Sequence, residues 1–177
     1  MTAKLTLILG GARSGKSRRA EQIASAEGRP VLYIATCATD LADPEMAARI
    51  QAHRDQRPSY WTTSENNFDL PALFAEHALQ TVLLDCLTLW LSYHCEHLEE
   101  SSLLSKLEGS LVFAREKFVS LIIVSNELGM GLVPSTPLGR SFRDLCGRAN
   151  QMVARHADHV EFQIAGLPLL LKGGSAQ

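Results

Sequence analysis

The chain of 177 residues lacks the features that mark disulfide-bonded secreted proteins and membrane proteins. Its four cysteines show no C-x-x-C spacing, and they favour reduced thiols in the cytoplasm. The longest apolar run, residues 81–91, is interrupted by Asp85 and is too short to cross a bilayer. No positively charged stretch followed by an apolar one opens the chain, so we expect neither a targeting signal nor membrane insertion.

An excess of charge of either sign is also missing. The formal net charge is −2 and charged residues make up 20 % of the chain, which indicates neither a disordered tail nor a nucleic-acid partner. Repeats, low-complexity stretches and linkers are absent from the sequence. With 46 % hydrophobic residues, the length suits one globular domain, which we assign to residues 1–177.

The most informative segment is residues 10–17, which read Gly-Gly-Ala-Arg-Ser-Gly-Lys-Ser after an apolar run. This is the G-x-x-x-x-G-K-[ST] phosphate-binding loop, whose glycines let backbone N–H groups surround phosphate oxygens. Lys16 brings a positive charge near the β- and γ-phosphates, and the Ser17 hydroxyl is suited to hold Mg²⁺. The helix that follows directs its positive end at the same anion. The sequence therefore predicts nucleotide binding.

Apolar strand-like runs alternate with helical patterns, which is typical of an α/β fold around a mostly parallel sheet. We predict a RecA-like P-loop NTPase, with helices flanking the sheet and an antiparallel hairpin at the C-terminal side that turns at residues 166–168. The predicted strands are 5–9, 31–35, 82–85, 121–125, 160–165 and 169–172. The predicted helices are 16–27, 44–54, 70–77, 88–97, 103–118 and 138–157.

Ligands of such sheets bind beyond the carboxyl ends of the strands, which directs attention to the residues that follow each strand. Asp85 ends the apolar run 82–84, as a Walker-B carboxylate does, and we expect it to bind Mg²⁺ opposite Ser17. Its strand is expected near the first one. The loop 125–134, with two glycines and a proline, suits either a structural turn or a substrate loop.

His53 lies near the end of the predicted helix 44–54 and has two interpretations. It is either a half-buried histidine beside the apolar stripe of that helix, or a nucleophile that attacks a phosphorus atom. Arg49, Arg54 and Arg57 are close enough in sequence to neutralise phosphoryl oxygens. The histidine-containing segments 94–97 and 156–159 lack a second ligand pair, so we do not expect metal sites there.

Several motifs together resemble those of a known family, the bifunctional adenosylcobinamide kinase / adenosylcobinamide-phosphate guanylyltransferase of cobalamin biosynthesis. The resemblance extends from residue 5 to about residue 172. The motifs that carry it are residues 10–17, Tyr-Ile-Ala-Thr at 33–36, Glu-Met-Ala-Ala-Arg-Ile at 45–50, Arg-Pro at 57–58, Asn-Glu-Leu-Gly-Met-Gly at 126–131 and Phe-Arg-Asp at 142–144.

The resemblance implies an enzyme with two half-reactions and Mg²⁺ as cofactor. ATP or GTP phosphorylates the hydroxyl of adenosylcobinamide, and GTP then guanylylates His53, which passes GMP to adenosylcobinamide phosphate. It also implies a homotrimer. The implied catalytic residues are His53 and Lys16, and Ser17 and Asp85 hold the metal. The implied nucleotide contacts are Gly10, Gly11, Ala12, Arg13, Ser14, Gly15, Lys16, Ser17, Ala35, Thr36, Cys37, Arg54, Asp55, Gln56, Arg57, Glu65 and Asp85.

Two other functions are compatible with the same phosphate loop: a small-metabolite kinase without a covalent step, and a nucleotide-dependent regulatory module. The sequence also leaves two candidates, Asp85 and Glu127, for the residue that orients the acceptor hydroxyl in the kinase half-reaction. Guanylyl transfer makes no such demand, because its acceptor is a phosphate that is already anionic.

Overall fold

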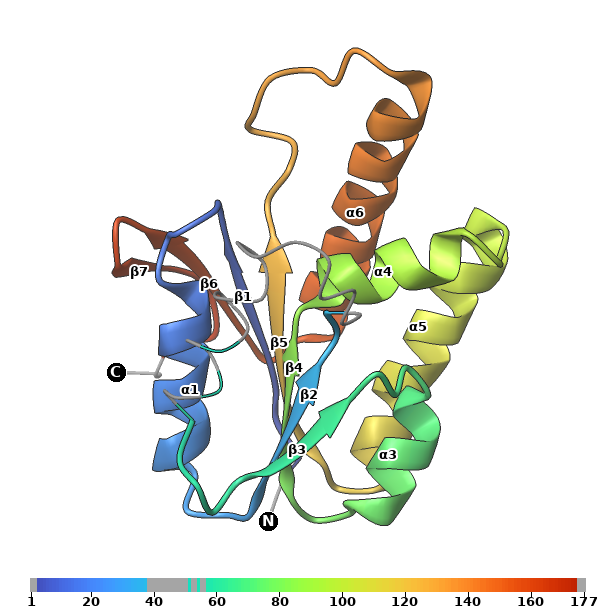
Figure 1. The fold of residues 1–177 in the computed structure, drawn as a ribbon. Coiled ribbons are helices and arrows are strands. Elements are labelled where there is room, and N and C mark those ends of the chain that lie inside the picture. The colour runs from blue at the N-terminus through green and yellow to red at the C-terminus, as the bar shows by residue number, and fades with distance from the viewer. Residues whose placement is uncertain (1–2, 38–50, 52–53, 55–56, 175–177) are drawn as a thin grey trace.

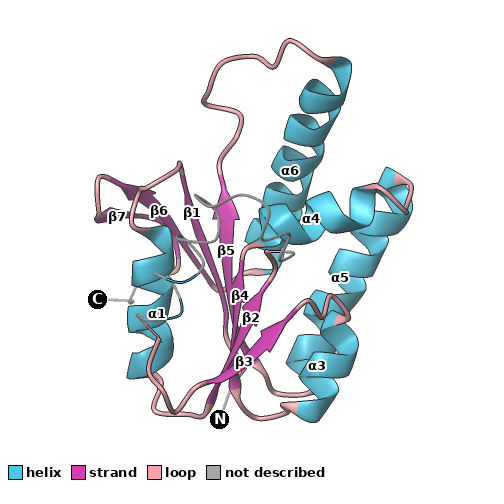
Figure 2. Cartoon of the chain, viewed as in Figure 1, coloured by secondary structure: helices cyan, strands magenta, loops and turns pink. Residues whose placement is uncertain are grey.

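A computed structural model describes residues 3–37, 51, 54 and 57–174, and it places seven strands in one sheet (Figures 1 and 2). The strands are β1 (Leu5–Gly10), β2 (Val31–Ala35), β3 (Thr62–Glu65), β4 (Thr81–Asp85), β5 (Ser120–Asn126), β6 (His159–Ile164) and β7 (Leu167–Lys172). The helices are α1 (Lys16–Ala26), α3 (Leu70–Glu76), α4 (Leu87–Cys95), α5 (Glu100–Glu116) and α6 (Pro137–His156).

The strand order is β3-β2-β4-β5-β1-β6-β7, and all neighbouring pairs are parallel except β6 and β7. The predicted α/β fold with a C-terminal antiparallel hairpin is therefore confirmed. All residues of β1 are buried, because helices cover both faces of a central parallel strand. The Asp85 strand is not the immediate neighbour of β1, since β5 lies between them.

The helices divide unequally between the two faces of the sheet. Helix α1 lies on one face, while α3, α4, α5 and α6 cover the other (Figure 1). Ala20 and Ala24 of α1 pack with Tyr33 and Trp61 in the smaller apolar cluster. The larger cluster includes Trp90, which is fully buried and donates its indole N–H to the Phe68 carbonyl at 3.0 Å.

Two local predictions were wrong. Strand β3 was not predicted, because its sequence Thr-Thr-Ser-Glu is polar and only partly buried at the edge of the sheet. The hairpin turns at Ala165 and Gly166, whose φ angles of 52° and 81° are those of a tight turn with left-handed residues. Leu167 and Pro168 instead pair with β6, and proline is tolerated there because β7 is an edge strand.

Most of the predicted helix 44–54 lies outside the described residues, so the structure does not test it. None of the helices within the described ranges combines the length and apolar character that a bilayer crossing would need. The connection from β5 to α6 extends beyond the carboxyl edge of the sheet together with the first turns of α6 (Figure 1). It exposes the apolar side chains of Met130, Leu132 and Val133.

Candidate functional site

The phosphate loop joins β1 to α1 with its backbone held open for an anion. Gly15 precedes α1 with φ at 94°, and an added Cβ there would lie 3.2 Å from the Gly166 Cα atom. No side chain of the described residues caps the N-terminus of α1. The first amides of this helix are therefore free to donate to a bound phosphate, at the positive end of the helix dipole.

The loop is supported from within and by the C-terminal hairpin. Lys16 Nζ donates to the Gly11 carbonyl at 3.0 Å, which folds the lysine side chain back over the loop. The Gly166 N–H donates to the Ser14 carbonyl at 2.9 Å. Ser14 Oγ is buried and has no hydrogen-bond partner in the described part of the chain, so this hydroxyl is available to a ligand.

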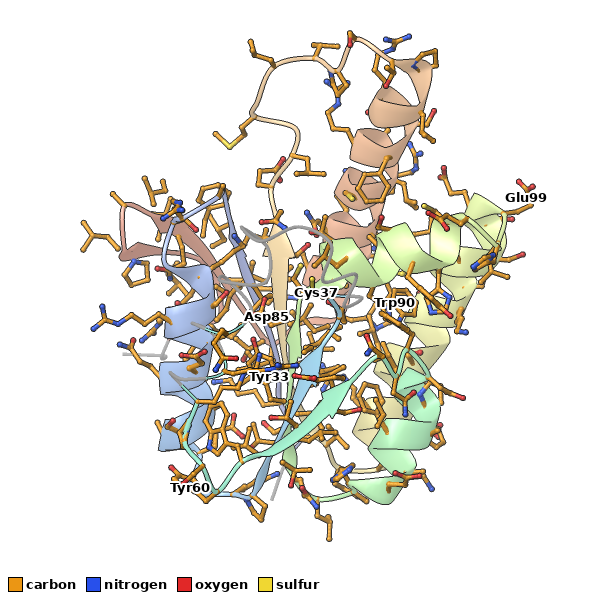
Figure 3. All side chains as sticks on the ribbon, viewed as in Figure 1. Tyr33, Cys37, Tyr60, Asp85, Trp90 and Glu99 are labelled. Atoms are coloured by element: carbon orange, nitrogen blue, oxygen red, sulfur yellow. The ribbon has the colours of Figure 1, made fainter. Side chains whose placement is uncertain are left out.

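Asp85 lies at the carboxyl end of β4, on the next strand but one from β1. Tyr33 lies below it in β2 and donates its hydroxyl to Asp85 Oδ2 at 2.8 Å (Figure 3). Thr36 accepts from the Cys86 N–H and donates to the Cys86 carbonyl, both at 2.7 Å, which joins the ends of β2 and β4. The carboxylate is therefore held at the edge of the sheet by its neighbours on β2.

A second carboxyl group lies close to Asp85. Glu21 is one turn after Ser17 on α1, and its Oε1 atom is buried without a hydrogen-bond partner among the described residues. Burial, together with the negative charge of Asp85, raises the pKa of Glu21 to about 7, although Arg57 acts in the opposite direction. Burial and the charge of Asp85 likewise raise the pKa of Tyr33, so its hydroxyl keeps its proton.

A cleft of about 280 Å³ opens beside Glu65 at the outer strands. Arg54 forms a two-pronged pair with Glu65, with nitrogen–oxygen distances of 3.0 and 2.6 Å, and lowers the pKa of that carboxyl. Arg57 stacks on the Tyr33 ring with 3.8 Å between the guanidinium carbon and the ring centre. Arg57 Nε and Trp61 Nε1 are buried donors without partners among the described residues.

The carboxyl end of β5 carries a second polar group of contacts. Thr88 Oγ1 accepts from the Asn126 backbone N–H at 3.0 Å and from its side-chain amide at 3.2 Å. Asn150, buried on α6, accepts from Ser125 Oγ at 2.6 Å and donates to the Asn126 carbonyl at 3.2 Å. These contacts fix the end of β5 between α4 and α6, directly beside the phosphate loop.

The structure brings most of the predicted nucleotide contacts to one edge of the sheet. Glu65, Ala35 and Asp85 are in register on β3, β2 and β4, and Gly10 is in register with Asn126 on β1 and β5. The phosphate loop, Thr36, Cys37, Arg54 and Arg57 complete the described part of the set. His53, Asp55 and Gln56 lie outside the described residues.

The sequence interpretation missed three polar residues near this edge, namely Glu21, Thr88 and Asn150, and it missed Trp61, which precedes β3 and lines the cleft beside Glu65. A carboxylate one helical turn after Ser17 was the available signal for Glu21, because residues four apart on a helix share a face. The buried thiols are excluded as nucleophiles. Burial raises the pKa of Cys86 to about 11 and that of Cys146 to about 12, so both stay protonated near neutral pH.

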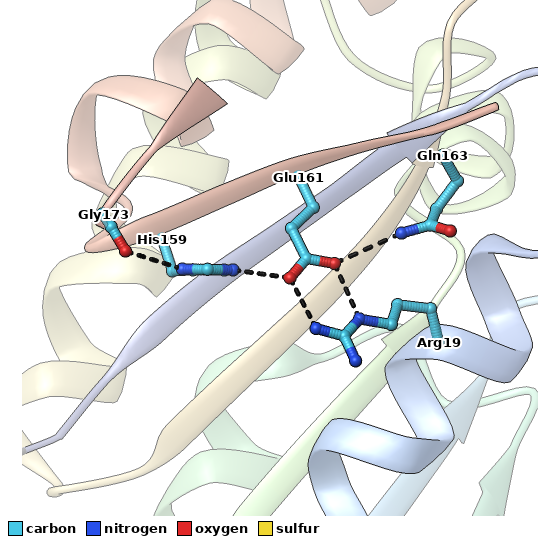
Figure 4. A network of polar contacts seen from close by, with 5 residues as sticks. All are labelled: Arg19, His159, Glu161, Gln163 and Gly173. Atoms are coloured by element: carbon cyan, nitrogen blue, oxygen red, sulfur yellow. Dashed lines mark hydrogen bonds and ion pairs between the residues drawn. The ribbon is translucent and has the colours of Figure 1, made fainter. Parts of the chain in front are cut away.

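Another network, behind the phosphate loop, ties α1 to β6 (Figure 4). Arg19 donates to both oxygens of Glu161, at 2.8 and 2.7 Å, and Gln163 donates to the same carboxylate at 3.2 Å. His159 Nε2 lies 2.8 Å from Glu161 Oε1, while its Nδ1 lies 3.2 Å from the Gly173 carbonyl. Glu161 is only 3 % exposed, and its hydrogen bonds from Arg19 lower its pKa to about 2.

Comparisons with known proteins agree with this architecture. A family model described as cobinamide kinase / cobinamide phosphate guanyltransferase matches residues 6–171. The bifunctional adenosylcobalamin biosynthesis protein CobP of Pseudomonas aeruginosa is 43 % identical over 94 % of this chain and 96 % of its own length. The corresponding protein CobU of Salmonella typhimurium is 37 % identical over 95 % of this chain and 99 % of its own length.

Solved structures of much lower identity share the fold. The RadB recombinase superposes with a TM-score of 0.55 at 14 % identity, and covers 98 % of this chain and 83 % of its own. A KaiC-like protein from Pyrococcus horikoshii gives the same TM-score at 16 % identity, with coverage of 97 % and 80 %. These likenesses confirm the predicted RecA-like fold of the chain.

Proposed function

Because the chain belongs to the family of cobinamide kinase / cobinamide phosphate guanyltransferase, we propose that it makes adenosylcobinamide-GDP in two steps. The family is one of bifunctional enzymes of cobalamin biosynthesis. In the first step, a nucleoside triphosphate, ATP or GTP, phosphorylates adenosylcobinamide. In the second step, GMP from GTP is added to adenosylcobinamide phosphate by way of a guanylylated histidine.

The observation that carries the proposal is the phosphate loop itself. It leads into the N-terminus of α1, which no side chain of the described residues caps, and its strand β1 is separated from β4, the strand that ends in Asp85, by β5 alone. Residues 10–17 hold the triphosphate in the proposed complex, with Lys16 as the charge on its terminal phosphates. The nucleoside extends across the carboxyl ends of β4 and β2, past Ala35, Thr36 and Cys37. The remaining nucleotide contacts are those of the segment 54–57.

Glu65 and its cleft are proposed to receive the guanine base. A carboxylate accepts well from the adjacent N–H groups of guanine, and the buried donors of Arg57 and Trp61 are open to a ligand. Neighbouring strands are about 5 Å apart, so Glu65 lies about 10 Å along the sheet from Asp85. The phosphate loop follows β1, two strands beyond β4, so the proposed nucleotide extends along the edge of the sheet from its base at β3 to its phosphates at β1.

Ser17 and Asp85 are the proposed ligands of Mg²⁺. A hydroxyl and a carboxylate form the hard oxygen donor set that this cation prefers, and both belong to the edge where the phosphates bind. When bound, the cation neutralises the negative charge of the phosphates. Tyr33 supports the site by holding the Asp85 carboxylate in one orientation.

His53 is the proposed nucleophile that carries GMP. The residues that follow it support this role, because Arg54 and Arg57 both line the cleft beside Glu65 and place positive charge there. A neutral imidazole attacks the α-phosphorus of GTP, pyrophosphate leaves, and the phosphate of the acceptor later displaces the histidine. Each step needs charge stabilisation more than a strong base.

Labelling with GTP that carries a radioactive α-phosphate tests this proposal. We expect the purified protein to acquire a label that is labile in acid and stable in base, and His53→Ala to remove it. His97→Ala is the matched control, because His97 is an exposed residue beyond α4, and it should keep the label. Active protein that never acquires the label would be a kinase without a covalent step.

We also propose that the enzyme works in the cytoplasm as a homotrimer. The structure places no disulfide between its four cysteines, as expected for a reducing compartment. Strand β7 supports self-association, because it is an edge strand whose leucines are exposed by about half or more.

A further inference from the structure

Glu127 lies where the chain leaves β5, beside the phosphate loop. The last residue of β5, Asn126, is in register with Gly10, the last residue of β1. The Glu127 backbone N–H donates to the Gly10 carbonyl at 3.1 Å. Since β5 lies between β1 and β4, Glu127 stands between the phosphate loop and the strand that ends in Asp85.

The Glu127 side chain is held in one orientation with half of its carboxylate left open. Its Oε1 atom accepts the Gly129 backbone N–H at 2.6 Å. In the part of the chain that the structure describes, no hydrogen bond engages the other oxygen, Oε2. An added Cβ on Gly129 would lie 2.9 Å from Oε1, so a side chain at this position would push the Glu127 carboxylate aside.

Asp85, the other candidate from the sequence, is engaged elsewhere and lies deeper. It is in register with Val124, two residues before Asn126, which places it about 7 Å below the level at which the phosphate loop leaves β1. Tyr33 already donates to one of its oxygens. Its proposed role as a magnesium ligand also makes this carboxylate a poor proton acceptor.

We propose that Glu127 is the catalytic residue that orients and deprotonates the acceptor hydroxyl in the phosphorylation half-reaction. This inference rests on the proposed function. The hydroxyl oxygen forms a bond to the γ-phosphorus as the bond from that phosphorus to the β,γ-bridging oxygen breaks. The hydroxyl proton passes to Glu127 Oε2, and the nucleoside diphosphate leaves.

The proposed role of Glu127 is needed in the phosphorylation half-reaction and not in guanylyl transfer. The phosphorylation acceptor is a neutral alcohol that must lose a proton, whereas the guanylylation acceptor is a phosphate that is already anionic. Removal of the Glu127 charge therefore slows the first half-reaction much more than the second. A residue that merely maintained the loop would affect both half-reactions alike.

Glu127→Gln tests the proposal, with both half-reactions measured on the same protein. We expect kcat for phosphorylation of adenosylcobinamide to fall by about 100-fold or more, with little change in KM. Guanylyl transfer is assayed with adenosylcobinamide phosphate supplied directly. The ratio of the two rates should fall by at least about 50-fold.

Two further variants serve as a positioning test and a control. Gly129→Ala pushes the Glu127 carboxylate aside without removing it and should lower the same ratio, by less than Glu127→Gln does. Glu116→Gln, on the exposed surface of α5, should leave the ratio unchanged. Equal losses in both half-reactions, or an unchanged ratio in Glu127→Gln, would overturn the role of Glu127. If the wild-type protein phosphorylates no adenosylcobinamide at all, the proposed function itself fails.

Discussion

At the scale of single residues, Lys16 connects the two proposed half-reactions. Its ammonium group lies over the phosphate loop, and its Nζ atom is 3.0 Å from the Gly11 carbonyl. At this position it would bring positive charge to the terminal phosphates of a bound nucleotide. In the proposed mechanism the same lysine serves the triphosphate of each half-reaction.

Lys16→Ala should abolish both half-reactions, with losses of about 100-fold or more, because one loop holds the nucleotide in each. Product analysis by chromatography measures phosphorylation, and transfer of labelled GMP to protein measures guanylylation. Lys106→Ala on α5 is the matched control and should keep both activities. Guanylylation that survives in Lys16→Ala would reveal a second nucleotide site.

The candidate residues that the sequence could predict are those whose spacing alone carries the chemistry. The phosphate loop and Asp85 each follow an apolar strand, so their place at the edge of the sheet follows from the pattern. The roles of Tyr33 and Glu21 could not be predicted in this way, because each role depends on which strand and which helix lie close to Asp85. Only the order of the strands brings them to Asp85, and spacing along the chain does not encode that order.

At the scale of secondary-structure elements, the contacts of Glu161 join α1 to β6 and reach the end of β7. The helix that presents its N-terminus to the nucleotide is thereby fixed against the strand next to β1. A buried carboxylate that keeps its charge needs such partners, because loss of one leaves the charge unpaired. The position of α1 thus depends on a residue of the C-terminal hairpin.

Glu161→Gln should lower the free energy of unfolding by an amount that depends on pH. The folded protein holds the pKa of Glu161 at about 2, against 4.5 ordinarily. Its charge therefore stabilises the fold above about pH 4.5, by about 3 kcal/mol, and this contribution is lost as pH falls toward 2.

Urea unfolding of both proteins at pH 6 and pH 3.5 measures this effect. The difference between wild type and Glu161→Gln should be smaller at pH 3.5 by about 1 kcal/mol or more. Glu116→Gln, whose carboxylate is exposed on α5, provides the reference and should show little difference at either pH. An equal difference at the two pH values would mean that the Glu161 charge does not hold α1 and β6 together.

Among the elements, the hydrophobic pattern predicted the strands that pack in the core and missed β3, which does not. Strands β1, β4 and β5 are mostly apolar along their length because both of their faces are covered. Strand β3 is held by its backbone pairing with β2 and buries little side-chain surface, so its residues are under no demand to be apolar. The hairpin turn was misplaced by about two residues, since Pro168 reads as a turn residue until its strand is known to be an edge.

At the scale of the whole molecule, the β6–β7 hairpin leaves an apolar margin on the sheet. Leu167, Leu169, Leu170 and Leu171 are between 48 and 72 % exposed. An edge strand with unpaired backbone groups and bare leucines is favourable for pairing with another chain. This margin is where we expect self-association to occur.

The double variant Leu169→Glu with Leu171→Glu should shift the protein toward a single-chain species in sedimentation velocity. Two buried negative charges without partners at the contact would disfavour assembly strongly. Val112→Glu on α5 is the control, since Val112 is also exposed, at 44 %, and should leave the sedimentation coefficient unchanged. A wild-type protein that sediments as a monomer, or a double variant that still assembles, would contradict this assignment.

The place of β1 in the sheet has a consequence for synthesis on the ribosome. The phosphate loop precedes β5, β6 and Gly166 in the chain, but its strand pairs with β5 and β6, and Gly166 supports the loop from the hairpin. Nearly the whole chain must therefore leave the exit tunnel before the nucleotide site takes shape. Chains cut short by premature termination would therefore carry the loop sequence without a formed nucleotide site.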